Sequence, residues 1–199
     1  MISVTDLGAG SRVHKSSERK ISAIAHHSLK SPRMGRFLNR LAKFTPGGAM
    51  LELGTSLGLS SSYLAETGKH LTTIEGCPNI AEVARLNFAQ LQLSNISLKI
   101  GPFDDQLPLV LANQTDINLA FVDGNHSYEA TLRYYKLLRK HLPNESVIVF
   151  DDIYWSKGML RAWNEIVHQN PQQVTVDLFH FGLVFLREGQ ASEHFKLRL

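Results

Sequence analysis

AMLELGTSLG, residues 49–58, is the stretch that decides the fold. Its apolar first half, Ala49–Leu53, predicts a buried strand, and the residues from Leu59 to Thr67 predict a helix that follows a glycine-containing turn. Gly54 and Gly58 in that turn let a ligand approach the backbone, and the free N–H groups at the start of the helix attract an anionic group. The stretch therefore predicts an α/β fold with a site for a nucleotide-like ligand at the end of its first strand.

Outward from this stretch, short β-rich runs alternate with helical runs along the chain. The predicted strands are 70–75, 96–100, 117–122 and 147–150, and the predicted helices are 79–91, 105–112, 128–141 and 157–169. This alternation is typical of a parallel sheet built from crossover units. The runs 173–178 and 183–186 are separated by too few residues for a helical crossover, so they predict an antiparallel hairpin at the edge of the sheet.

The first 43 residues differ in charge from the rest of the chain. They carry a net charge of +7, which leaves −4 for the remainder. We expect residues 1–43 to form a basic segment of one or two helices, broken at Ser31-Pro32, that packs beside the sheet and covers a site as a lid. Residues 44–187 are expected to form the ligand-binding domain, and residues 188–199 a C-terminal tail. The basic segment lacks the interleaved aromatic residues of single-strand nucleic-acid binders, so nucleic acid is not the expected partner.

Composition places the chain among single-domain globular proteins. It has 199 residues, 43% of them hydrophobic and 20% charged, which excludes a disordered, collagen-like or coiled-coil chain. No apolar run approaches the roughly 18 residues of a membrane-spanning helix, and Met1–Gly10 does not have the pattern of a signal peptide. The single cysteine, Cys77, cannot form a disulfide within the chain. We therefore expect a cytoplasmic protein that has no membrane partner.

Residues at the ends of the first three strands of the domain predict the kind of ligand. A carboxylate at Glu75 can accept hydrogen bonds from both ribose hydroxyls of an adenosine. Ser56 stands where the nicotinamide-dinucleotide fingerprint requires a glycine, which argues against a pyrophosphate there and against a dehydrogenase. The turn at residues 101–104 is expected to lie along the adenine edge. These residues indicate a ligand that contains a nucleoside but is not a dinucleotide.

Over about residues 35–186, the chain resembles the class I S-adenosylmethionine-dependent methyltransferases. Residues 35–41 are similar to the helix that precedes the first strand in the catechol and caffeoyl-CoA O-methyltransferase type. Residues 121–129 and 149–152 are similar to strand ends of a related bacterial group, many of whose members modify sugars or small hydroxylated metabolites. The resemblance implies a Rossmann-like, doubly wound seven-stranded α/β sheet of order 3-2-1-4-5-7-6, with strand 7 antiparallel. It also implies S-adenosylmethionine as the cofactor, with binding residues at the first four strand ends: Glu52, Gly54, Thr55, Ser56, Gly58, Ser60, Glu75, Gly76, Gly101, Phe103 and Asp123.

Carboxylates at the strand ends should converge on one crevice, where they need a cation among them. Asp123, Asp151 and Asp152 fall where the resemblance places magnesium ligands, although Asp152 stands in place of the family's asparagine. Mg²⁺ held by these oxygens would bind acceptor hydroxyls and lower the pKa of one of them. The alternative is that Asp151 and Asp152 cap the next helix and bind nothing.

The resemblance also indicates where a general base should lie. Three residues after Asp123, where the catechol-type family has a catalytic lysine, this chain has His126. An imidazole has an ordinary pKa near 6.5 and is a suitable base at neutral pH. The expected catalytic residues are therefore His126, Asp123 and Asp151.

The sequence thus predicts transfer of a methyl group from S-adenosylmethionine to a hydroxyl oxygen of a small-molecule acceptor. An N-methyltransferase acting on nucleic acid or protein is one alternative, but such enzymes often carry Asn/Asp-Pro-Pro-Tyr where residues 123–126 read Asp-Gly-Asn-His. A cofactor-binding protein without activity is another, and a homodimer is left open as the assembly. A second glycine-rich run, Asp6–Gly10, has neither a strand before it nor an apolar helix after it, so we predict a loop there.

Overall fold

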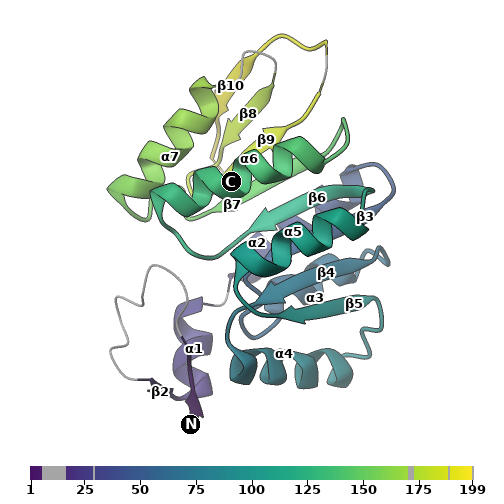
Figure 1. Cartoon of the computed structure of the whole chain (residues 1–199), viewed down its shortest axis with the longest axis vertical. Coiled ribbons are helices and arrows are strands. Elements are labelled where there is room, and N and C mark those ends of the chain that lie inside the picture. The colour runs from purple at the N-terminus through teal and green to yellow at the C-terminus, as the bar shows by residue number, and fades with distance from the viewer. Residues whose placement is uncertain (6–16, 29, 170–172, 188, 199) are drawn as a thin grey trace.

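Eight strands form one sheet at the centre of the computed structural model, and helices cover both of its faces (Figure 1). The structure describes residues 1–5, 17–28, 30–169, 173–187 and 189–198, and the predicted loop Asp6–Gly10 lies outside them. From one edge to the other, the strands are β10 (Glu193–Lys196), β8 (Val174–Asp177), β9 (Phe181–Phe185), β7 (Val147–Asp151), β6 (Ile117–Val122), β3 (Ala49–Leu53), β4 (Leu71–Glu75) and β5 (Ile96–Ile100).

The order of seven of these strands confirms the prediction. Counted from β3 as the first strand, they follow the order 3-2-1-4-5-7-6, and the seventh, β9, runs antiparallel to both β7 and β8. The sheet has one strand more than predicted, because β10 pairs in parallel with β8 within the segment predicted to be a tail. All four residues of β10 are exposed, so this strand lacks the apolar alternation by which a strand is recognised in a sequence.

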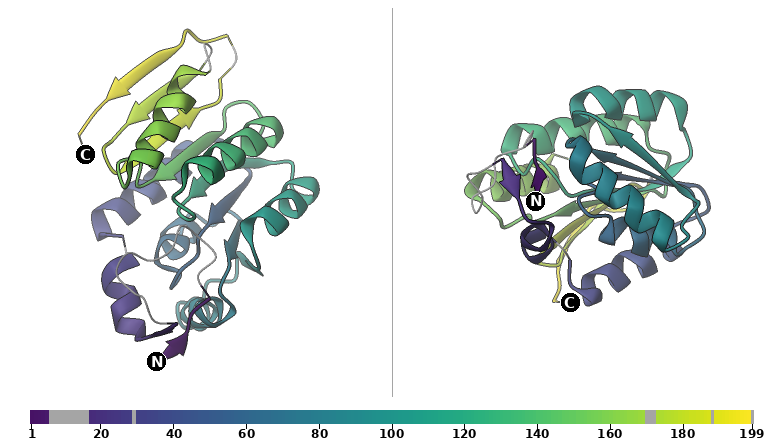
Figure 2. Two further views of the ribbon diagram at one scale, coloured as in Figure 1. Left: turned by 60° about the vertical axis from the view of Figure 1, so that its left-hand side comes forward. Right: turned by 90° about the horizontal axis from the view of Figure 1, so that it is seen from below.

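Five helices connect the strands of the sheet. They are α3 (Leu59–Ala65), α4 (Pro78–Gln90), α5 (Phe103–Asn113), α6 (Tyr128–His141) and α7 (Lys157–His168). The helices α5, α6 and α7 pack on one face, whereas α3 and the earlier helix α2 (Pro32–Phe44) pack on the other (Figure 2). Every residue of β3 is buried between these layers, which explains why Ala49–Leu53 is a nearly continuous apolar run. None of the helices in the described ranges is long and apolar enough to cross a membrane.

Parallel pairing brings the carboxyl ends of the central strands to one edge of the sheet. Leu53, at the end of β3, pairs with Ile74 of β4 on one side and with Val122 of β6 on the other. The amide of Asp123 donates to the carbonyl of Leu53 at 2.8 Å, and the amide of Gly54 donates to the carbonyl of Ile74 at 2.9 Å. The turns that follow these strands therefore meet at this edge, as expected for an open α/β sheet.

The N-terminal segment begins with a pair of short antiparallel strands, β1 (Ile2–Ser3) and β2 (Glu18–Arg19), followed by α1 (Ile21–Ser28). Val4 and Ile24 of this segment pack in a small apolar cluster with Ile80 of α4. Two-residue strands are too short to produce a periodic pattern, and the sequence did not predict them.

The predicted break at Ser31-Pro32 is confirmed. The hydroxyl of Ser31 accepts a hydrogen bond from the amide of Met34, and Pro32 is the first residue of α2. The next helix, α3, holds α2 in place: the side-chain amide of Asn39 donates to the carbonyl of Tyr63 at 2.7 Å. A Cβ at Gly35 would lie 2.3 Å from the Tyr63 ring, so the glycine allows the two helices to approach closely.

Candidate active site

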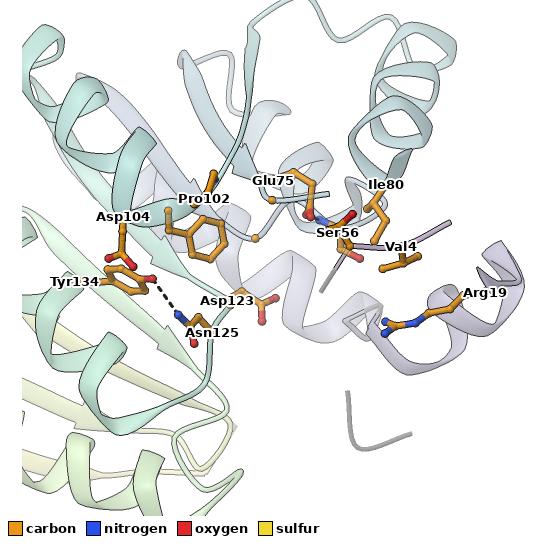
Figure 3. A pocket seen from close by; sticks show the side chains of 15 residues that line it. Val4, Arg19, Ser56, Glu75, Ile80, Pro102, Asp104, Asp123, Asn125 and Tyr134 are labelled. Carbon is orange, nitrogen blue, oxygen red and sulfur yellow. Dashed lines mark hydrogen bonds between the residues drawn. The ribbon is translucent and has the colours of Figure 1, made fainter. Parts of the chain in front are cut away.

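A cavity of about 230 Å³ opens at the edge of the sheet where β3, β4, β5 and β6 end (Figure 3). It is lined by Val4, Thr5, Arg19, Gly54, Ser56, Glu75, Gly76, Ile80, Pro102, Phe103, Asp104, Asp123, Gly124, Asn125 and Tyr134. The predicted cofactor residues in this group are Gly54, Ser56, Glu75, Gly76, Phe103 and Asp123. In Figure 3, Glu75 and Ser56 lie on one side of the cavity, Asp104 and Tyr134 on the other, and Asp123 between them.

The turn after β3 depends on a glycine at position 54. Gly54 has φ +102°, and a Cβ there would lie 2.0 Å from the backbone carbonyl oxygen of Asp123. The turn continues through Ser56, which also has a positive φ of 48°. A left-handed conformation at a non-glycine residue is uncommon and often marks a functional turn. The close approach of Gly54 to Asp123 joins the ends of β3 and β6 into one wall of the cavity.

Glu75, at the end of β4, is fixed by backbone amides. One carboxylate oxygen accepts from the amide of Ser56 and the other from the amide of Cys77, each at 2.9 Å. Burial raises the pKa of this carboxyl group, while the amide hydrogen bonds oppose the increase. The carboxylate is therefore held in one orientation at the cavity, where its remaining lone pairs can accept hydrogen bonds from a ligand.

Glu52 lies beneath the cavity and is not one of the residues that line it. Successive side chains of β3 point to opposite faces of the sheet, and that of Glu52 points toward the face covered by α3. The side chain of Glu52 is therefore fully buried. There it accepts hydrogen bonds from the hydroxyls of Ser60, Ser61 and Thr73. Burial raises the pKa of Glu52 to about 7, although these hydroxyls favour the charged form. Thr55 extends the same buried network through its hydroxyl, 2.6 Å from that of Thr73.

Two other glycines predicted to contact the cofactor lie against protein side chains. A Cβ on Gly58, which precedes α3, would come within 2.4 Å of the Phe88 ring. One on Gly101, after β5, would lie 3.0 Å from the side chain of Gln106. Glu52, Thr55, Gly58, Ser60 and Gly101 thus support the walls of the cavity without lining it.

Phe103 forms an apolar wall of the cavity. Its ring lies edge-on to Tyr134 of α6, with centroids 5.9 Å apart. The ring also occupies the space that a Cβ on Gly124 would need, since the distance would be 2.7 Å. The hydroxyl of Tyr134 in turn accepts a hydrogen bond from the side-chain amide of Asn125 at 3.1 Å. The Phe103 ring thus offers a planar apolar surface within this side of the cavity, which suits a planar ring of a ligand.

Asp123 and Asp151, which we call the acid pair, meet a lysine from the N-terminal segment. The ammonium of Lys30 contacts Oδ2 of Asp151 and lies 3.3 Å from Oδ2 of Asp123. Asp151 is fully buried, and its Oδ1 has no hydrogen-bond partner among the described residues. Burial and the neighbouring Asp123 raise the pKa of Asp151. Burial alone would lower the pKa of Lys30, but the acid pair outweighs burial and raises it above its ordinary value.

His126 lies beside the acid pair and is partly exposed. Its Nε2 is 3.7 Å from Oδ1 of Asp123, an ion-pair distance that is beyond hydrogen-bond range. Ligand atoms of Asp123, His126 and Asp151 lie within 4.8 Å of one another, whereas Asp152 is not in this group. The structure thus brings the three predicted catalytic residues together.

The alternative role predicted for Asp151 and Asp152, capping the next helix, is wrong. The residue before α7 is Ser156, and its hydroxyl accepts from the amide of Met159 at 3.1 Å. Asp152 has φ +53° and uses its backbone carbonyl to accept from the amide of Trp155. It therefore shapes the turn after β7.

The donor atoms present do not fit the predicted Mg²⁺ site. Mg²⁺ takes oxygen ligands at about 2.1 Å, and the two carboxylate oxygens that it would share here contact the Lys30 ammonium. The third nearby donor is the imidazole nitrogen of His126, a ligand less suited to Mg²⁺ than oxygen. Since one position cannot hold both an ammonium and a metal ion, we assign no chemical step to a metal.

Some residues at the site were not expected from the sequence. The N-terminal segment supplies Val4, Thr5 and Arg19 to the cavity wall, and Lys30 to the acid pair. The excess of basic residues in this segment was the one available signal, because a basic segment near a cluster of carboxylates should pair with it. That signal does not single out Lys30 among nine basic residues.

Comparisons with known proteins agree with this architecture. Residues 51–153 match the model of a family described as "Methyltransferase domain". The chain is 30% identical over 134 residues to a catechol O-methyltransferase of Mycobacterium tuberculosis. This match covers 65% of this chain and 59% of that protein. It is 32% identical over 74 residues to a protein-L-isoaspartate O-methyltransferase of Picosynechococcus, covering 37% of this chain and 33% of that protein. The matches thus span 59% and 33% of the length of these relatives, in both cases less than two thirds.

Solved structures include similar folds. The O-methyltransferase TomG from Streptomyces achromogenes, in complex with SAM, superposes with a TM-score of 0.70. The two chains are 20% identical, and the match covers 85% of this chain and 91% of TomG. At this level of identity the likeness concerns the fold.

Proposed function

The chain belongs to the methyltransferase-domain family, and from this premise we propose that it transfers a methyl group from S-adenosylmethionine to a hydroxyl oxygen of a small molecule. One observation carries the proposal: Gly54 and Ser56 of the turn after β3, the fixed carboxylate of Glu75 and the ring of Phe103 line the same cavity. These are the contacts that an adenosine with a short charged tail requires.

Each part of the cavity has a role in binding this molecule. Glu75 accepts hydrogen bonds from the ribose hydroxyls, and Phe103 lies against the adenine. The glycine at position 54 keeps the cavity open to the methionine part, near the carboxylate of Asp123. When bound, the sulfonium supplies a methyl carbon that an oxygen nucleophile can attack. Most of the rate enhancement would come from holding acceptor and methyl donor in line, about 3 Å apart.

The group at the end of β6 is placed to accept the proton of the acceptor. His126 is the base, and the carboxylate of Asp123, 3.7 Å away, orients the ring and stabilises the imidazolium. The ammonium of Lys30 offsets part of the negative charge of the acid pair. The imidazole is partly exposed, which lets the proton pass to solvent after the transfer.

Aromatic side chains in the turn after β7 support a small, flat acceptor. Tyr154 and Trp155 lie in this turn and are 38% and 45% exposed. The Tyr154 ring stacks on Phe179 with centroids 5.2 Å apart, and its hydroxyl donates to Asp177 at 2.6 Å. Partly exposed rings that are held in place by such contacts suit a ligand with a flat apolar body and a hydroxyl group.

Calorimetric titration with S-adenosylhomocysteine tests the cofactor assignment. We expect Glu75→Ala to weaken binding by about 100-fold, because charged hydrogen bonds to two hydroxyls contribute about 1.5–3 kcal/mol each. Glu82→Ala is the matched control, since Glu82 is exposed on α4 and pairs with Arg85. Circular dichroism of both variants checks that they are folded.

The same titration can contradict the proposal. Equal affinity in wild type and Glu75→Ala would show that this carboxylate does not hold the ribose. Competition by NAD at similar concentrations would point to a dinucleotide instead. Labelled S-adenosylmethionine offered with phenols, sugars and thiols then identifies the acceptor class.

A further inference from the structure

Lys30, in the N-terminal segment, provides a positive charge to the acid pair. Lys30 and Asp151 are 121 positions apart in the sequence, yet the ammonium of Lys30 contacts Asp151 and lies 3.3 Å from Asp123. Its side chain is 14% exposed, which is low for a lysine. A lysine that is largely buried between two carboxylates is a built part of the site.

The backbone that follows Lys30 is fixed by structure that does not involve the acid pair. Ser31 caps α2 directly after Lys30, and Pro32 begins the helix. The helix itself is anchored to α3 by the hydrogen bond from Asn39 to Tyr63 and by the buried side chain of Leu38. The docked helix therefore presents the lysine to the acid pair at a set position.

Lys30 also occupies the position that a metal ion would need. An ion bound by both members of the acid pair must lie close to the same oxygens, Oδ2 of Asp123 and Oδ2 of Asp151, that the ammonium contacts. Asp151 depends on this contact, because it is fully buried and its other oxygen has no hydrogen-bond partner among the described residues. Without Lys30, two adjacent carboxylates would repel each other and attract a divalent cation.

We propose that the Lys30 ammonium takes the place of a divalent cation between Asp123 and Asp151, so that the methyl transfer needs no divalent metal. The second half of this inference rests on the function proposed above. Lys30 is then a positioning residue: it fixes the two carboxylates, which in turn orient His126 and the acceptor.

The first half of the proposal, that Lys30 takes the place of a divalent cation, can be tested without any catalysis. The protein is titrated with Mn²⁺ alone, and the electron paramagnetic resonance signal of the free ion measures how much Mn²⁺ is bound. We expect wild type to bind no Mn²⁺ at the acid pair. Lys30→Met should gain a site, and its affinity for Mn²⁺ should be at least about tenfold higher than that of wild type, because the ammonium that repels the ion is gone. The double variant with Lys30→Met and Asp151→Asn should lose that site again. Lys30→Arg keeps the charge and should behave as wild type does, as should Lys43→Met, which removes an exposed lysine of α2.

Two outcomes would overturn the proposal: Mn²⁺ binding by wild type as tight as that by Lys30→Met, or no gain in folded Lys30→Met. If Lys30→Met does not fold, wild type is compared with Asp123→Asn. Mn²⁺ binding that is present in wild type and lost in Asp123→Asn contradicts the proposal, and equal weak binding supports it.

The activity measurement concerns the second half of the inference. The initial rate of methyl transfer by wild type should be unchanged by a chelator and by added Mg²⁺. A rate that collapses with the chelator would overturn metal independence. Absence of transfer to any acceptor would count against the proposed function, while the Mn²⁺ result would still report on Lys30.

Discussion

The two ends of the site are built in different ways. The end that holds Glu75 is made by turns that directly follow neighbouring strands, and its hydrogen bonds join residues 2 to 19 positions apart. The end that holds the acid pair depends on Lys30, which reaches it across 121 positions. The turns of the first end are formed by the sheet itself, although Val4, Thr5 and Arg19 of the N-terminal segment complete its cavity wall. The counter-ion of the second end is in place only once the N-terminal segment has docked. A local turn is readable from the sequence, and a long-range counter-ion is not.

The largest effect is expected from Gly54→Ala, which disrupts the turn at the end of the site that holds Glu75. A Cβ at this position would meet the Asp123 carbonyl, and the residue would have to keep a φ of +102°. Strain and overpacking together should lower the free energy of unfolding by about 4 kcal/mol. Urea denaturation measures this loss. Gly47→Ala is the control, because no atom lies within 4 Å of a Cβ there; equal stability of the two variants would mean that the turn tolerates a side chain.

The next effect is a pH dependence caused by Glu52 beneath the turn. Its pKa is about 7 in the folded chain and about 4.5 when unfolded, so between these pH values the folded state binds more protons. Stability should therefore fall as pH rises from about 4.5 to 7, by about 3 kcal/mol from this group alone. Glu52→Gln should remove this part of the decline, which urea denaturation at pH 5 and pH 8 would measure. A variant with the same pH dependence as wild type would show that Glu52 is charged in the fold at all these pH values.

A smaller effect is expected at the long-range end, from His126→Gln. Loss of the base should lower the rate of methyl transfer by about 100-fold. The variant should also change how the rate depends on pH, because the group that accepts the proton has been removed, so rates from pH 6 to 9 are the measurement. His141→Gln is the control, because His141 is exposed at the end of α6. An unaltered pH profile in His126→Gln would assign the proton transfer to another group.

The smallest effect should come from Tyr134→Phe, on the wall between the two ends. Its hydroxyl accepts a hydrogen bond from Asn125 at 3.1 Å, and the loss of this bond should cost about 1 kcal/mol of stability. Affinity for S-adenosylhomocysteine should change by less than about threefold, because the ring at position 134 still supports Phe103. A tenfold loss of affinity in the calorimeter would instead place the hydroxyl in contact with the ligand.

The sequence predicts the two ends of the site to different extents. The bounds of β3, β5, β6 and α6 are those predicted, because each is a strong apolar run or a strongly amphipathic one. Glu75 is placed correctly at the cavity because parallel strands bring their ends to one edge. The strands β1, β2 and β10 were missed because they are short or exposed, and such strands have no apolar pattern.

Glu52 shows a second reason why sequence falls short. Its position beside the glycine turn predicted contact with the cofactor, whereas in the structure it points to the opposite face from Leu51 and Leu53. What alternation cannot predict is that the first turn of α3 places Ser60 and Ser61 against its carboxylate. A partner contributed by a packed helix depends on tertiary structure, as does the contact of Lys30 with Asp151.

The separation of Lys30 and Asp151 also sets the order in which the protein can mature. During synthesis, Asp151 is added 121 residues after Lys30, so the N-terminal segment leaves the ribosome long before the carboxylate that it pairs with exists. Until then the lysine lacks its fully buried partner, so the complete contact must form late, after the central strands have been synthesised. A chain that ends before Asp151 has no acid pair.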